Sequence, residues 1–172
     1  VQIRDSAEKT WVIFSDTVSA VPSVTVSGLR NGMKYAFRVA AVNDAGVGKY
    51  SSVVNATPRT VPGSPGGLEA IPGDERVSLS WVMPADTGGA AVTDYVVEYR
   101  ISSETGWSVY PGGSRKVPSV TVTGLVNGAS YDFRVAAVNA AGLGAFSDVR
   151  TAVLRAVPGA PTDLAVVPGD GQ

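Results

Sequence analysis

The chain has no cysteine and no histidine among its 172 residues. Without cysteine, no disulfide can hold the fold together, and cysteine pairing gives no indication of the redox compartment. The lack of both residue types also removes the usual zinc ligands, the Cys–His and Ser–His nucleophile arrangements, and the commonest general base near neutral pH. We therefore expect a protein that is not an enzyme and that uses no metal and no cofactor.

Charge and long apolar runs are also scarce. Charged residues make up 17% of the chain and the formal net charge is −1, so no basic excess exists to hold nucleic acid or an anionic membrane. No apolar run approaches the roughly 18 residues that a membrane-spanning helix needs. With 44% hydrophobic residues, the composition indicates a soluble globular protein with no nucleic-acid partner and no membrane insertion.

What the chain does contain is a long internal repeat. The segment VPSVTVSGLRNGMKYAFRVAAVNDAG (21–46) returns as VPSVTVTGLVNGASYDFRVAAVNAAG (117–142), 96 residues later. Aligned at this offset without a gap, 38 of 76 residue pairs are identical. A unit of this length can bury its own hydrophobic core, unlike short repeats that must stack on one another. The repeat therefore predicts independently folding modules.

Within the middle repeat, apolar and polar residues alternate over several short segments, which is typical of half-buried β-strands. Segments rich in Gly, Pro, Asn and Asp separate them, and no long stretch has helical periodicity. This pattern predicts an all-β, antiparallel β-sandwich. The expected inward-facing residues are Val77, Leu79 and Trp81; Tyr95, Val97 and Tyr99; Val120 and Val122; and Tyr131, Phe133, Val135 and Ala137.

The repeat also predicts where the modules begin and end. Residues 1–60 are expected to form a partial module without its first two strands, residues 61–156 a complete module, and residues 157–172 the first strand of a further module. Half a sandwich exposes an apolar face and an unpaired sheet edge. We therefore expect a window of a longer array, and expect that, if the partial modules are ordered, more chain or strand addition between copies covers that face.

The middle repeat also carries a combined signature at fixed spacing. Its residues are Trp81, Tyr95, Tyr99, Leu125 and Tyr131, and Leu29 and Tyr35 repeat the last pair. With this signature the chain resembles, over its whole length, the fibronectin type III domain, a family of immunoglobulin-like sandwiches that recur in tandem. In this family, the leucine at 125 and the tyrosine at 131 would form a corner between the sheets, with the phenol bonded to nearby backbone.

Few residues offer a binding chemistry. Trp107, flanked by Tyr110, could stack on a sugar ring, and Trp11 occupies the matching position; the alternative is that these rings only cover neighbouring side chains. Asp86, with Asp94 nearby, could suggest a calcium site, but a turn supported by the Asp86 side chain is favoured.

The outer face of the predicted sheet carries charges of both signs. Arg38 and Arg134 project from this face, and Glu98 and Arg100 lie on the neighbouring strand. Cross-strand ion pairs there would adjust the sheet face and identify no partner. The Arg-Gly-Asp integrin motif of some family members is absent.

The resemblance implies a non-catalytic spacer and interaction array of a large extracellular or cell-surface bacterial protein, with adhesion or fibre formation as an extension. Proline-containing linkers, PRTVPGSPGG (58–67) and LRAVPGAPTD (154–163), would make semi-rigid joints. The bacterial setting follows from a likeness of PADTGGAAVTDYVVEYR (84–100) to tandem copies in such proteins. Two alternatives stay open: an accessory module of a secreted polysaccharide-degrading enzyme, and a virion or tail protein module. Protein or glycan partners fit all three.

Overall fold

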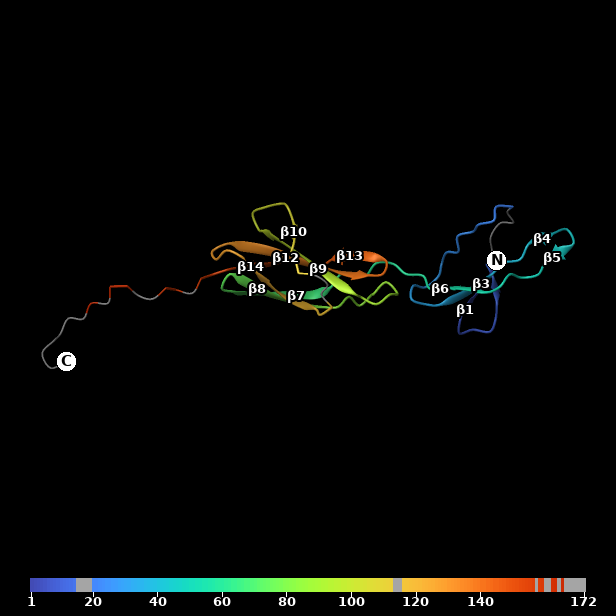
Figure 1. Ribbon diagram of the computed structural model, residues 1–172, viewed down its shortest axis with the longest axis horizontal. Coiled ribbons are helices and arrows are strands. Elements are labelled where there is room, and N and C mark those ends of the chain that lie inside the picture. The colour runs from blue at the N-terminus through green and yellow to red at the C-terminus, as the bar shows by residue number, and fades with distance from the viewer. Residues whose placement is uncertain (15–19, 113–115, 157, 160–161, 164, 166–172) are drawn as a thin grey trace.

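The computed structural model describes residues 1–14, 20–112, 116–156, 158–159, 162–163 and 165. All regular elements of this part of the chain are β-strands, and no helix in it could span a membrane. The strands form two groups that lie end to end along the longest axis of the molecule (Figure 1). The prediction of an all-β fold is therefore confirmed.

The complete module is a sandwich of two antiparallel sheets. Its strands are β7 (Gly66–Gly73), β8 (Arg76–Val82), β9 (Asp94–Ile101), β10 (Ser108–Val109), β11 (Ser119–Thr123), β12 (Ser130–Asn139), β13 (Gly142–Phe146) and β14 (Arg150–Val153). One sheet has the order β11-β8-β7 and the other the order β10-β9-β12-β13. Strand β14 pairs with the first half of β12, and β13 pairs with its second half.

The core lies between these sheets, where the alternating residues predicted it. On β8, Val77, Leu79 and Trp81 are at most 5% exposed, while the residues between them are exposed. On the facing sheet, Val97 and Val135 are fully buried and pair across the strands. Each fully buried side chain of this kind contributes about 1.5–3 kcal/mol. Tyr99 and Val120, also expected inside, are half-buried at the edge of the core.

The corner that the family resemblance implies is present in both repeats. The backbone N–H of Val126 donates a hydrogen bond of 3.2 Å to the hydroxyl of Tyr131. In the first repeat, the N–H of Arg30 donates to the hydroxyl of Tyr35 at 3.1 Å. The aliphatic partner Leu125 is buried. The bond fixes the connection between β11 and β12 where the chain changes sheets.

The N-terminal group of strands forms a single layer. Its sheet has the order β2-β1-β3-β6, and a separate hairpin extends from it; the strands are β1 (Gln2–Asp5), β2 (Val12–Ile13), β3 (Tyr35–Arg38), β4 (Val42–Asn43), β5 (Gly46–Val47) and β6 (Val54–Ala56). Val39 is 52% exposed, whereas its counterpart Val135 is fully buried. The layer thus has an open inner face, and the strand pairs that define it all lie within residues 1–57. The expectation that more chain or strand addition between copies covers this face stays a prediction.

The expected first strand of a further module falls in residues 157–172, most of which lie outside the described residues. The predicted division into residues 1–60, 61–156 and 157–172 stays a prediction.

Candidate interaction surface

Asp86, the residue considered for a calcium site, supports its own turn. The N–H of Gly88 donates a hydrogen bond of 2.8 Å to Asp86 Oδ1, the two-residue spacing of an Asx turn. Asp94 Oδ1 accepts a bond of 2.7 Å from the N–H of Tyr95. Within the described ranges, no three acidic side chains are grouped closely enough to hold a metal ion. The turn interpretation accounts for Asp86, whereas Asp94 lies at the start of β9.

Trp107 lies on the outer face of the second sheet, covered by arginine. The guanidinium carbons of Arg100 and Arg134 lie 4.5 and 4.2 Å from its ring centroid. Arg134 also lies 4.2 Å from the ring of Phe146. We call these four residues the Trp107 stack. Each cation–π contact contributes about 0.5–1 kcal/mol at an exposed site. A sugar that bound flat on Trp107 would have to compete with these guanidinium groups.

Carboxylates from the same face hold both arginines over the ring. Arg134 Nη2 lies 2.6 Å from Glu98 Oε2, so the predicted cross-strand ion pair is confirmed. Arg100 donates from Nε and Nη2 to Asp132 Oδ2, at 3.1 and 3.0 Å. The charges of this face therefore neutralise one another, and no bare cation is left on the stack for an anionic partner.

Asp132 is the most buried charged group of the complete module, at 7% exposure. Its Oδ1 accepts hydrogen bonds of 2.8 Å from the hydroxyls of Ser102 and Thr151. Burial alone would raise the pKa of Asp132, but the bonds from Thr151, Ser102 and Arg100, with the Arg100 charge, outweigh it and lower the pKa. Asp132 therefore stays ionised and fixes Arg100 over Trp107.

Tyr110 does not belong to the Trp107 surface. Its ring packs edge-on against the ring of Tyr99, with 6.2 Å between the two ring centroids, and it lies against the hydrophobic core. Its hydroxyl donates to the carbonyl of Thr121 at 3.2 Å, which ties the end of β10 to the opposite sheet. Trp107 and Tyr110 are three positions apart in the sequence, so an extended chain places them on opposite faces. The proposed pair of aromatic rings for one sugar is not brought together.

Trp11 repeats the stack in the N-terminal layer. Arg4 and Arg38 lie over its ring at 4.7 and 4.2 Å, and Arg38 also lies 4.2 Å from the ring of Tyr50. Arg38 Nε donates to Gln2 Oε1 at 2.8 Å, where the complete module uses the Arg134–Glu98 pair. The two repeats therefore build the same outer face from partly different side chains.

The N-terminal layer lacks one residue of the network that surrounds Arg100 in the complete module. Ala36 stands at the position that corresponds to Asp132. Arg4 Nε is buried there and meets no hydrogen-bond partner among the described residues. The equivalent nitrogen of Arg100 has its carboxylate. The missing carboxylate is a physical reason for the unsatisfied nitrogen.

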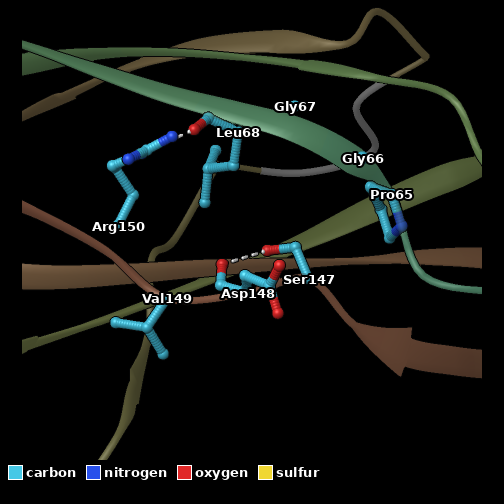
Figure 2. Close-up of a pocket in the computed structure, with 8 residues that line it drawn as sticks. All are labelled: Pro65, Gly66, Gly67, Leu68, Ser147, Asp148, Val149 and Arg150. Atoms are coloured by element: carbon cyan, nitrogen blue, oxygen red, sulfur yellow. Dashed lines mark hydrogen bonds between the residues drawn. The ribbon is translucent and has the colours of Figure 1, made fainter.

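A hollow of about 210 Å³ lies between β7 and the β13–β14 connection (Figure 2). The side chains of Arg150 and Ser147 in its lining are already hydrogen-bonded. Arg150 Nε donates to the carbonyl of Leu68 at 2.9 Å, and Ser147 Oγ donates to the carbonyl of Asp148 at 2.9 Å. Ser147 Oγ also accepts from the N–H of Val135. These bonds close the open side of the sandwich, and the hollow contains no arrangement of nucleophile and base.

Sequence reasoning missed two asparagines that organise the loops. Asn127 Nδ2 donates to Asp74 Oδ1 at 2.7 Å, and the N–H of Glu75 donates to Asn127 Oδ1 at 3.1 Å. Asn139 bonds both to the linker and to the β8–β9 connection. Both asparagines are repeated 96 positions earlier, as Asn31 and Asn43. That identity was the available signal.

Comparison with known proteins agrees with this geometry. The family profile described as "Fibronectin type III domain" matches residues 1–57 and 63–153. Protein sidekick-1 of Gallus gallus is 33% identical over 168 residues, which is 94% of this chain and 8% of that protein. Titin of Drosophila melanogaster is 32% identical over 150 residues, which is 84% of this chain and 1% of that protein. The chain thus spans a small fraction of these relatives.

Among solved structures, the crystal structure of domains A168-A170 from titin has a TM-score of 0.63 at 23% identity. It covers 90% of this chain and 54% of that one. This likeness concerns the fold, since the identity is low. The family profile covers most of the chain and matches both strand groups. The chain therefore belongs to the fibronectin type III domain family.

Proposed function

We propose that the chain is a non-catalytic structural spacer and interaction array. The end-to-end arrangement of its two strand groups is the observation that carries the proposal (Figure 1). The chain enters the complete module at β7 and leaves it after β14. Successive modules of this kind therefore lengthen the molecule. Sandwiches of this kind break many strand hydrogen bonds when pulled apart, and each unit opens separately.

Small-angle X-ray scattering tests the spacer. A compact globule of this length would have a radius of gyration of about 16 Å. The series arrangement predicts a clearly larger radius and a pair-distance distribution with a long tail. A radius near the compact value would contradict the proposal, because the two strand groups would then have to fold onto each other.

We further propose an extracellular or cell-surface setting in a bacterial protein. The support is the likeness of residues 84–100 to tandem copies in such proteins; the two relatives named above are animal proteins. Limited proteolysis of intact source cells, followed by detection with an antibody against this chain, tests the location. Loss of the epitope from intact cells supports the surface setting, and protection until lysis contradicts it.

For partner recognition, the proposal places protein or glycan contacts on the Trp107 and Trp11 faces. Titration with a glycan panel while Trp fluorescence is recorded tests the glycan part. Trp107→Phe is the matched control, since it should abolish the signal that Trp107 produces. A response that survives both this change and Trp11→Phe would place the contact outside the two proposed faces.

Self-association belongs to the same proposal. The open inner face of the β1–β3–β6 layer exposes apolar residues such as Val39 and Val54, and an open β-layer can accept strands of another chain. Light scattering measures the molar mass in solution. A mass that rises with concentration supports strand addition, whereas a strictly monomeric chain contradicts it.

A further inference from the structure

The contacts between the two modules form more than a flexible tether. Residues 58–63 connect them, and the loops 86–89 and 139–144 of the complete module enclose this linker. We propose that these segments form a docking joint that seats the Asn31–Gly32 turn of the preceding module in one fixed geometry. The inference deepens the proposed array function, since a spacer would also serve with a loose joint.

The linker is hydrogen-bonded along its length. The N–H of Thr60 donates to the carbonyl of Gly88 at 2.8 Å, and the N–H of Gly63 donates to the carbonyl of Asp86 at 2.9 Å. At the other end, the N–H of Gly32 donates to the carbonyl of Pro58 at 2.9 Å. The linker thus runs alongside the β8–β9 connection and is hydrogen-bonded to it. The prolines of this segment restrict the backbone further.

Asn139 connects the three parts of the joint. It is 4% exposed, and its Nδ2 donates bonds of 2.8 Å to the carbonyls of Thr60 and Thr87. Its Oδ1 accepts the N–H of Ala141 at 2.7 Å, which fixes the β12–β13 turn. One buried amide therefore ties the linker to two loops, and each of its donors has a partner.

Glycine allows the backbones to approach closely. A Cβ on Gly88 would overlap the carbonyl oxygen of Thr60, and a Cβ on Gly89 would overlap the amide nitrogen of Gly32. A Cβ on Gly144 would overlap the carbonyl oxygen of Pro62. The atoms in the way are backbone atoms, which cannot rotate aside. Side chains at these three positions would therefore force the joint open.

The docked turn is preformed. In the complete module, the N–H of Gly128 donates to the carbonyl of Leu154 at 2.9 Å, as Gly32 does to Pro58. The backbone φ angles agree, at +86° for Gly128 and +82° for Gly32. Yet among the described residues a Cβ on Gly128 would meet nothing within 4 Å. The two turns have the same shape although the described residues seat a module only on the Gly32 turn, so docking requires no rearrangement of this turn.

Double electron–electron resonance tests the joint in the full chain. Because the chain has no cysteine, the substitutions Asn55→Cys and Ser78→Cys place one spin label on each module. The parent should give a narrow distance distribution. Gly89→Ala should broaden it, whereas Gly128→Ala, which changes a glycine of similar φ with open surroundings, should leave it narrow. A broad parent distribution, or equal broadening in both variants, would overturn the proposal.

Amide hydrogen exchange at Thr60 provides a second measurement, which depends only on the linker and the complete module. Asn139→Asp keeps the oxygen that serves Ala141 but loses both donors, so the protection of Thr60 should fall by about tenfold or more. Asn43→Asp is the matched control, since Asn43 makes the same turn bond to Ala45 at 2.9 Å and is exposed. An unprotected Thr60 in the parent, or an equal loss in both variants, would overturn the joint. Either failure would leave the scattering test of the spacer unaffected.

Discussion

Two side chains of the complete module each hydrogen-bond polar groups from other segments of the chain. The Tyr131 hydroxyl accepts a hydrogen bond from the backbone of Val126 at the corner. The Asp132 carboxylate accepts hydrogen bonds from Arg100, Ser102 and Thr151 on the outer face. Adjacent residues on β12 thus serve opposite faces, because side chains alternate along a strand. At the scale of single residues, these two are the points where the module should be most sensitive.

Tyr131→Phe should lower the free energy of unfolding by about 1 kcal/mol, because it leaves the Val126 N–H without its acceptor while the ring stays buried. Chemical denaturation measures the change. Tyr99→Phe is the control, since the Tyr99 hydroxyl makes no hydrogen bond within the described part of the chain and its ring stays in place. Equal losses in both variants would show that the corner bond contributes nothing specific.

The pKa of Asp132 gives the complete module an acid-sensitive contribution to stability. A carboxyl whose folded pKa lies below its unfolded value stabilises the fold above the unfolded pKa, near 3.9. This contribution is lost as the pH falls through the lowered pKa of Asp132. The free energies of unfolding of the parent and of Asp132→Asn, measured by denaturation between pH 7 and pH 2, should therefore converge as the pH decreases. Asp148→Asn, at an exposed carboxylate, should instead run parallel to the parent.

At the scale of elements, turns and connections depend on asparagine. Asn127 lies in the β11–β12 connection and bonds to the β7–β8 turn through Asp74 and Glu75. The N–H of Leu125 also donates to the carbonyl of Glu75, at 3.1 Å. Glu75 itself has a φ of +51°, a conformation that costs a non-glycine residue energy. The asparagine therefore holds a strained turn in place.

Asn127→Ala should destabilise the complete module by about 1–2 kcal/mol, because the Glu75 N–H loses its acceptor and the turn loses its support. Thermal unfolding followed by circular dichroism measures the loss. Asn31→Ala, at the matching and exposed position of the first repeat, should shift the transition of the complete module by little. A similar shift from both changes would contradict this role for Asn127.

The sequence predicts the strands more completely than it predicts the contacts between side chains on their surfaces. Alternation placed Val77, Leu79 and Trp81 in the core because the period of a strand needs only local information. The repeat placed the Tyr131 corner. Neither signal could show that Arg100 and Arg134 cover Trp107, since this depends on the register of β9 against β12. The spacing of Trp107 and Tyr110 already opposed a shared sugar platform.

At the scale of the whole molecule, the two modules should unfold separately and in order. The N-terminal layer has an open inner face and an unsatisfied Arg4 Nε, so it should melt first. Calorimetry should show two transitions. Ala36→Asp should raise only the lower one, by about 1 kcal/mol of stability, because it supplies the carboxylate that Arg4 lacks. In an Arg4→Met background the same substitution should destabilise, since the carboxylate would be unpaired.

The close backbone contacts at the joint glycines restrict which substitutions such an array can accept during evolution. A surface loop usually accepts most substitutions, yet Gly88, Gly89 and Gly144 leave no room for any side chain. Whole modules of this kind could therefore be duplicated or removed far more easily than the residues at their ends could be substituted. The number of modules, and with it the length of the parent protein, would then change readily. The angle between successive modules would stay the same.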